Sequence, residues 1–199
     1  MSGVFFYWAQ AVSDRWALEL FSTAKKVGLY AVLFQLGYYP ISLAVALATN
    51  FLGPIFFQRA GTGNDEKRNA DTARLGWRLT WYALGLTSLA FVVALLLHRQ
   101  IFMIFVGREY ASASGMLPWI VLAGGIFAAG QCLTLNLLST MKTRSMLNPK
   151  VFTALIGLAL NFIGAYWFGL DGVVLANVAF SVVYFLWMFA LHQRTTVRG

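Results

Sequence analysis

The chain has 199 residues, of which 59% are hydrophobic and only 11% are charged. Soluble domains carry about 25% charged residues, so this composition argues against a soluble protein and favours an integral membrane protein. The net charge of +8 is explained by the lysine and arginine that cytoplasmic loops of membrane proteins collect, and we expect no nucleic-acid partner.

Long uncharged runs predict helices that cross the lipid bilayer. The runs between Lys26 and Arg59 and between Glu109 and Lys142 are each 32 residues long, whereas about 20 apolar residues already span the ~30 Å hydrocarbon core. They are too long and too uniformly apolar for the alternating strands of a membrane barrel. We therefore expect one all-α membrane domain over residues 1–199, a bundle of six transmembrane helices at roughly 3–21, 28–57, 79–97, 115–140, 150–169 and 172–191.

The first of these segments carries the charged pair Asp14 and Arg15. If the helix begins near Gly3, Asp14 lies about 16 Å along its axis, near the middle of the bilayer. A charge there costs about 2.5–3.5 kcal/mol, so it should face a cavity or a partner. Two interpretations stay open. The pair lines a cavity, or it forms a structural clamp in which Arg15 meets Glu19 one turn further on, or Asp14 meets an arginine of another helix.

The second segment combines a polar stripe with two predicted bends. Polar side chains recur from Gln35 through Ser42 to Asn50 at spacings of seven to eight residues, which places them on one side of a helix. Such a stripe either lines a pathway or packs against another helix, since small polar residues are common at membrane helix contacts. The sequence also predicts bends at 37–40 and 53–54, where glycine and proline occur together.

The later segments add fewer candidates. The connection 58–78 has mixed charges and predicts a short solvated helix that leads into the third span. In the fourth span, Gln131, Thr134 and Asn136 form a polar cluster that either lines a pathway or permits close packing. The polar faces of the fifth and sixth spans should pack on each other, on either side of a tight turn at 169–172.

The distribution of basic residues predicts the orientation. Ten lysines and arginines lie in the connections after the second and fourth spans and in the C-terminal tail, against four in the other connections. The positive-inside rule places the side with ten in the cytoplasm. We therefore expect a multi-pass protein of a bacterial or archaeal cytoplasmic membrane, with both termini cytoplasmic and with 22–27, 98–114 and 170–172 facing outward.

No catalytic constellation is visible in the sequence. His98 and His192 lie at span ends without partners at metal-ligand spacing, and no phosphate-binding loop or nucleophile motif is present. An intramembrane enzyme built on Asp14 would need a second acidic residue at depth, and Glu19 is near an interface. We therefore expect a transporter rather than an enzyme, with no cofactor and no metal site.

Several stretches in the same order resemble the second half of polysaccharide (O-antigen type) flippases. The run Ser-Asp-Arg-Trp at 13–16 is followed by Ala-Lys-Lys-Val-Gly-Leu-Tyr-Ala-Val at 24–32 and Gln-Leu-Gly at 35–37. Residues 105–113 and the hairpin at 161–176 resemble later stretches of that family. The family belongs to the multidrug/oligosaccharidyl-lipid/polysaccharide exporter superfamily, and the resemblance runs from about residue 3 to 190.

The resemblance implies a fold and a function. The fold would be the C-terminal lobe of a two-lobe exporter that works by alternating access, with a missing N-terminal lobe or a second copy as partner. The function would be translocation of an undecaprenyl-pyrophosphate-linked oligosaccharide across the membrane. Arg15 would then compensate the pyrophosphate charge, since arginine binds phosphate through two parallel hydrogen bonds. Asp14 would neutralise Arg15 or couple to an ion, and Gln35, Asn50 and Asn136 would bind sugar hydroxyls.

Two other classes stay open at this point. One is a cation-coupled drug antiporter of the same superfamily, in which Asp14 would bind Na⁺ or H⁺. The other is a membrane scaffold or remnant that transports nothing, in which Asp14 and Arg15 would be freely replaceable.

Overall fold

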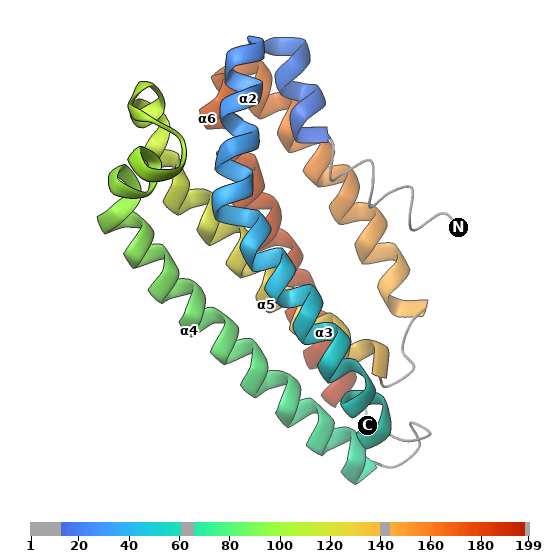
Figure 1. The fold of residues 1–199 in the computed structure, drawn as a ribbon. Coiled ribbons are helices and arrows are strands. Elements are labelled where there is room, and N and C mark those ends of the chain that lie inside the picture. Colours follow the sequence, from blue (N-terminus) through green and yellow to red (C-terminus); the bar gives the residue numbers. More distant parts are fainter. Residues whose placement is uncertain (1–12, 61–65, 140–143, 198–199) are drawn as a thin grey trace.

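The computed structural model describes residues 13–60, 66–139 and 144–197. Within these residues the protein is a bundle of long helices without strands, and most of the helices run side by side along one axis (Figure 1). Many large apolar side chains remain exposed on the outside of the bundle, among them Leu86, Leu96 and Ile104. In water such a surface would be unfavourable, whereas in a bilayer the lipid chains cover it.

Four helices of the described chain are long and apolar enough to cross a membrane: 24–56, 71–105, 113–135 and 151–193. The predicted count of six is not supported by this result. Two differences explain why four spans are found instead of six. Most of the expected first span, 3–21, lies outside the described residues, which show helix from 13 to 21. The expected fifth and sixth spans form a single folded helix.

The second predicted span is one continuous helical rod. It comprises α2 (Ala24–Leu33), the π-helix η1 (Phe34–Tyr38) and α3 (Tyr39–Ala60). At the first predicted bend, near Pro40, the structure has this π-helical turn, because proline lacks the N–H that would continue a regular α-helix. At the second predicted bend, Pro54 lies inside α3.

The third predicted span is part of a much longer helix. Helix α4 (Glu66–Phe105) has 40 residues, which corresponds to about 60 Å at 1.5 Å per residue. The short solvated helix expected within 58–78 is therefore not separate but continuous with the span. At the other end, the expected outward connection 98–114 is largely helical, since α4 runs to Phe105 and the 3₁₀-helix η2 (Arg108–Met116) follows.

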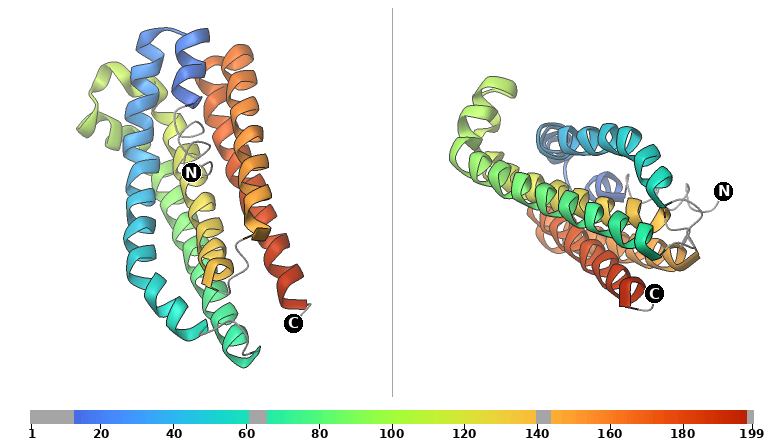
Figure 2. Two further views of the ribbon diagram at one scale, coloured as in Figure 1. Left: turned by 90° about the vertical axis from the view of Figure 1, so that its right-hand side faces the viewer. Right: turned by 90° about the horizontal axis from the view of Figure 1, so that it is seen from below.

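Helix α5 (Leu117–Ser139), the fourth predicted span, is the central helix of the bundle. It contacts α3, α4, α6 and η1, and Figure 2 shows it between the outer helices. Glycines permit these close contacts. A side chain at Gly125 would collide with Thr87 of α4, and one at Gly130 would collide with Tyr184 of α6.

Helix α6 (Arg144–Val197) reverses direction at Gly169, whose φ of 59° and ψ of −127° break the helix. Figures 1 and 2 show its two arms running antiparallel. The arms are in backbone contact, because a Cβ on Gly172 would lie 2.0 Å from the carbonyl oxygen of Gly164, and Gly157 lies against Phe180. The expectation that the fifth and sixth segments pack on each other around a tight turn is thus confirmed.

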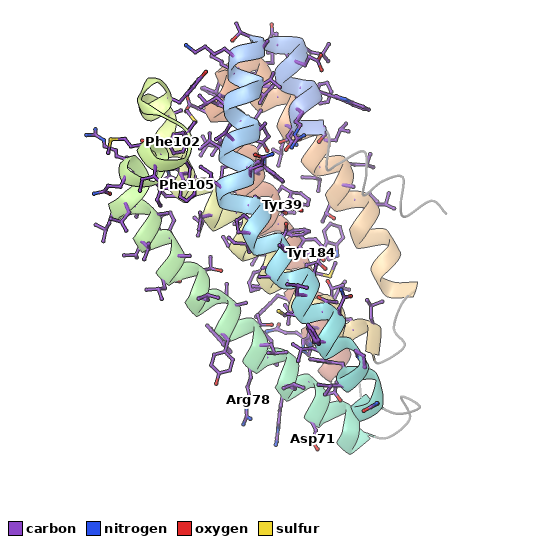
Figure 3. All side chains as sticks on the ribbon, in the orientation of Figure 1. Tyr39, Asp71, Arg78, Phe102, Phe105 and Tyr184 are labelled. Atoms are coloured by element: carbon purple, nitrogen blue, oxygen red, sulfur yellow. The ribbon has the colours of Figure 1, made fainter. Side chains whose placement is uncertain are left out.

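The two ends of the bundle differ in what they contain. The beginning of α4 and the end of α6 lie at one end of the bundle. We call it the basic end, because α4 begins within the lysine- and arginine-rich connection 58–78 and α6 ends in the basic C-terminal tail. Figure 3 shows Asp71 and Arg78 projecting there from α4. The start of α2 and the reversal at Gly169 lie at the opposite end, which we call the reversal end.

Candidate functional site

The carboxylate of Asp14 is buried and hydrogen-bonded. Asp14 is in the helical segment 13–21 and is 4% exposed. The hydroxyl of Tyr30, in α2, donates to one carboxylate oxygen, and the backbone N–H of Arg15 donates to the other at 2.8 Å. Burying a carboxylate is costly unless donors of this kind replace the lost water. The Asp14 side chain therefore belongs to a structured polar site within the bundle.

Both arms of α6 extend this polar site, which we call the Asp14 network. The amide nitrogen of Asn177 donates to the hydroxyl of Tyr30 at 3.0 Å and to the carbonyl of Val173 at 3.0 Å. On the other arm, the amide nitrogen of Asn161 donates to the hydroxyl of Ser13 at 3.0 Å. Three segments that are far apart in the sequence are thus connected by hydrogen bonds between side chains that are buried or nearly so.

The Asp14 network lies inside the apolar layer, in the half that adjoins the reversal end. Tyr30 is six residues beyond the start of α2 at Ala24, which is about 9 Å along the helix. Asn161 and Asn177 are each eight residues from Gly169, about 12 Å along their arms. These positions agree on a depth of roughly 10 Å below the reversal end, which is between that end and the centre of a ~30 Å layer and nearer to the centre.

The side chain of Arg15 has different surroundings from the Asp14 carboxylate. It is exposed, and its guanidinium carbon lies 6.0 Å from the centre of the Phe34 ring. Successive residues of a helix are about 100° apart around its axis, so a buried Asp14 and an exposed Arg15 are compatible with one helix. Phe34 in turn stacks on Tyr38, with ring centroids 4.5 Å apart. The cation is therefore presented on an aromatic surface rather than held inside the bundle.

The other residues that the sequence indicated are not gathered around Asp14. Gln35 lies in η1 and Asn50 in α3, and both side chains are exposed. The 15 residues between them correspond to about 22 Å along the rod, so they do not share one site. Asn136 belongs to α5, but its side chain lies outside the described residues. Thr134, its neighbour in the predicted cluster, is buried and hydrogen-bonded at 2.8 Å to the hydroxyl of Tyr184.

Sequence reasoning missed part of the Asp14 network. In the sequence, Tyr30 is only one residue of the stretch 24–32, and Asn161 and Asn177 belong to the polar faces that the fifth and sixth spans are expected to pack on each other. One signal was available, because both asparagines are eight residues from Gly169. In a hairpin with its reversal at Gly169, equal spacing places them at the same depth. No group of three or more potential metal ligands occurs among the described residues.

The described contacts predict that the hydrogen bond between Tyr30 and Asp14 is stronger than a neutral one. Tyr30→Phe should lower the free energy of unfolding by about 1.5–3 kcal/mol, since its partner is a carboxylate. Tyr184→Phe is a matched control, because Tyr184 is also buried but pairs with the neutral Thr134, and it should cost only about 0.5–1.5 kcal/mol. Thermal unfolding in detergent measures both losses of stability. Equal losses in the two variants would mean that Asp14 is a neutral carboxylic acid when it accepts the hydrogen bond from Tyr30.

No family model, curated protein or solved structure matches this chain. The class of protein is therefore defined by the fold alone. The chain is all-helical over its described residues, and its four apolar helices are compatible with a multi-pass membrane protein.

Proposed function

We propose that this chain is one lobe of a flippase that moves an undecaprenyl-pyrophosphate-linked oligosaccharide across the cytoplasmic membrane for surface polysaccharide synthesis. The observation that supports it best is the guanidinium of Arg15, which is exposed at the depth of the apolar layer and sits against Phe34. An arginine facing lipid chains at this depth would be costly, which favours a polar pathway beside it. The resemblance of residues 13–37 to polysaccharide flippases agrees with this proposal.

In this proposal the lobe crosses the membrane six times. The crossings would be the segment 3–21, the rod of α2, η1 and α3, helices α4 and α5, and the two arms of α6. The basic end would face the cytoplasm, with both termini on that side. The Asp14 network would then lie in the outer half of the membrane. A second lobe, either a separate polypeptide segment or a second copy of the chain, would close the other side of the pathway.

The roles of the two charged residues follow from their surroundings. Arg15 would bind the pyrophosphate, because a guanidinium offers two parallel N–H donors to phosphate oxygens. A low-dielectric environment strengthens this interaction. Asp14 would position Arg15 rather than touch substrate, since the carboxylate is held by Tyr30 and by the backbone N–H of Arg15 itself. We propose no enzymatic step and no cofactor for this cycle.

A second candidate is a cation-coupled antiporter, and the Asp14 network is the observation in its favour. The carboxylate of Asp14 and the hydroxyl of Tyr30 bring oxygen atoms together, and the hydroxyl of Ser13 belongs to the adjacent residue. Oxygen atoms are the ligands that hard cations prefer. In this function, binding of Na⁺ or H⁺ at Asp14 would drive export of an organic cation.

Reconstitution in vesicles separates the two candidate functions and the scaffold alternative. The protein, with any partner that co-purifies, is placed in vesicles that contain undecaprenyl-pyrophosphate-linked N-acetylglucosamine or, separately, ethidium. The flippase predicts that the lipid-linked sugar reaches the opposite leaflet, whereas the antiporter predicts ethidium efflux that depends on a Na⁺ or H⁺ gradient. Neither activity in well-folded protein would contradict both transport functions and favour a scaffold.

A further inference from the structure

The π-helix η1 changes the hydrogen bonds of two backbone carbonyls. In a regular α-helix the N–H of Tyr39 would bind the carbonyl of Gln35, but here it binds the carbonyl of Phe34. The carbonyl of Leu36 would need the N–H of residue 40, and Pro40 has none. The carbonyl of Gln35 loses its π-helical donor as well, because that donor would also be the N–H of residue 40. The carbonyl of Leu36 still has the N–H of Ile41 as its π-helical donor.

The carbonyl of Gln35 lies at the depth where such a loss is most unfavourable. Gln35 is 11 residues beyond Ala24, which is about 17 Å along the helix and near the middle of a bilayer core. Backbone groups without a helical partner are tolerated at this depth only where they are buried in protein or line a water-filled cavity.

Exposure decides between these two environments. The side chains of Gln35, Tyr39 and Pro40 are exposed, with Tyr39 at 56%. Gly37 marks the buried side of the same turn, since a Cβ there would lie 2.9 Å from Ile120 of α5. The described residues thus leave the side of Gln35 and Pro40 open, and a water-filled pathway is the environment that satisfies a free carbonyl there.

We propose that the carbonyl oxygen of Gln35 is an acceptor site for the hydroxyl groups of the sugar that the substrate carries. This inference rests on the proposed flippase function and adds a second subsite to it. The site offers an acceptor, so its ligand must donate a hydrogen bond. A metal cation is disfavoured because the guanidinium of Arg15 lies against Phe34, the residue just before Gln35. Hydroxyls donate without a net charge, and they would accompany the pyrophosphate bound at Arg15.

Pro40→Ala is the variant that tests the acceptor site. The new N–H at position 40 binds the carbonyl of Gln35 if the π-helical register persists, and that of Leu36 if the α-helical register returns. In the α-helical register the N–H of Tyr39 also returns to the carbonyl of Gln35, so the Gln35 acceptor is removed from the pathway in either register. Pro118→Ala is the matched control, because it makes the same substitution at the second residue of another helix, α5, where proline is well tolerated.

Two probes separate the sugar subsite from the phosphate subsite. Binding of undecaprenyl-pyrophosphate-linked N-acetylglucosamine and of undecaprenyl pyrophosphate is measured on the purified protein in nanodiscs. Pro40→Ala should weaken binding of the sugar-bearing probe about tenfold, the effect of losing a buried hydrogen bond. Binding of the sugarless probe should not change, and Pro118→Ala should behave as wild type. Equal losses for both probes, or no loss for the sugar-bearing one, would overturn the acceptor site.

A measurement on the wild type covers the case in which the variant does not fold. Gln35 and Leu36 form the only Gln–Leu step in the chain, so labelling glutamine carbonyls with ¹³C and leucine amides with ¹⁵N marks this one carbonyl in NMR spectra. The ¹³C chemical shift of this carbonyl should change when the sugar-bearing probe binds and should not change when the sugarless probe binds. An unmoved shift with the sugar-bearing probe bound would overturn the inference while leaving the flippase function intact. Binding of neither probe would refute both.

Discussion

Replacing Arg15 by alanine should abolish surface polysaccharide while leaving the amount of protein in the membrane unchanged. The variant removes a guanidinium that would supply two charge-assisted hydrogen bonds to the pyrophosphate. Each is worth about 1.5–3 kcal/mol, so together they represent at least a hundredfold in affinity. Folding should be nearly unaffected, because the side chain is exposed and its contact with Phe34 contributes only about 0.5–1 kcal/mol. The measurement compares polysaccharide on the cell surface with the protein level in the same membranes.

Two further variants make the Arg15 experiment specific. Arg15→Lys keeps the charge but loses the planar pair of donors, so it should restore only part of the polysaccharide. Arg78→Ala removes another exposed arginine, at the basic end of α4 (Figure 3), and should leave the polysaccharide at its normal level. Normal polysaccharide in Arg15→Ala would show that the pyrophosphate is bound elsewhere.

The second large effect is expected at the contact between the two arms of α6. A Cβ on Gly172 would lie 2.0 Å from the carbonyl oxygen of Gly164 and 2.8 Å from its Cα. These are backbone atoms, so the arms must separate to admit even a methyl group. Gly172→Ala should therefore lower the free energy of unfolding by about 3 kcal/mol or more, at the upper end of overpacking effects. The midpoint of thermal unfolding in detergent measures this loss.

Gly28→Ala is the matched control for Gly172→Ala. Gly28 lies within α2, and no atom of the described residues lies within 4 Å of the position that its Cβ would occupy. The same added methyl group should stabilise the protein by about 0.5–1 kcal/mol, because alanine favours helix over glycine. If Gly172→Ala were as stable as Gly28→Ala, the two arms of α6 could not be in backbone contact.

The separation of the Arg15 and Gly172 effects also tests the relation of function to fold. Arg15 is exposed and contributes to substrate binding in our proposal, whereas Gly172 is buried and contributes to packing. A loss of transport in Arg15→Ala with normal stability, together with a loss of stability in Gly172→Ala, would support this division.

The candidate site was predictable only in part. Asp14 and Arg15 stand out in the sequence because charges are rare inside apolar segments. The sequence predicts that they act as a pair because they are adjacent, but in the structure their side chains have different surroundings. The carboxylate turns into the bundle toward Tyr30 and Asn177, and the guanidinium turns outward over Phe34. A sequence shows that two residues are adjacent in the chain, but not which side of their helix is covered by its neighbours.

By itself, the sequence determined that the chain is helical and apolar, and where the helix backbone is irregular. Both properties are local, since each helix pairs its own backbone groups and proline removes a donor at its own position. The irregular turn before Pro40 and the reversal near Gly169 were predicted for this reason. Only the tertiary structure decided the length of α4 and the partners of Asp14. The composition of α4 does not by itself fix where the helix begins and ends. The side chains that meet across a bundle depend on how closely glycines let its helices approach.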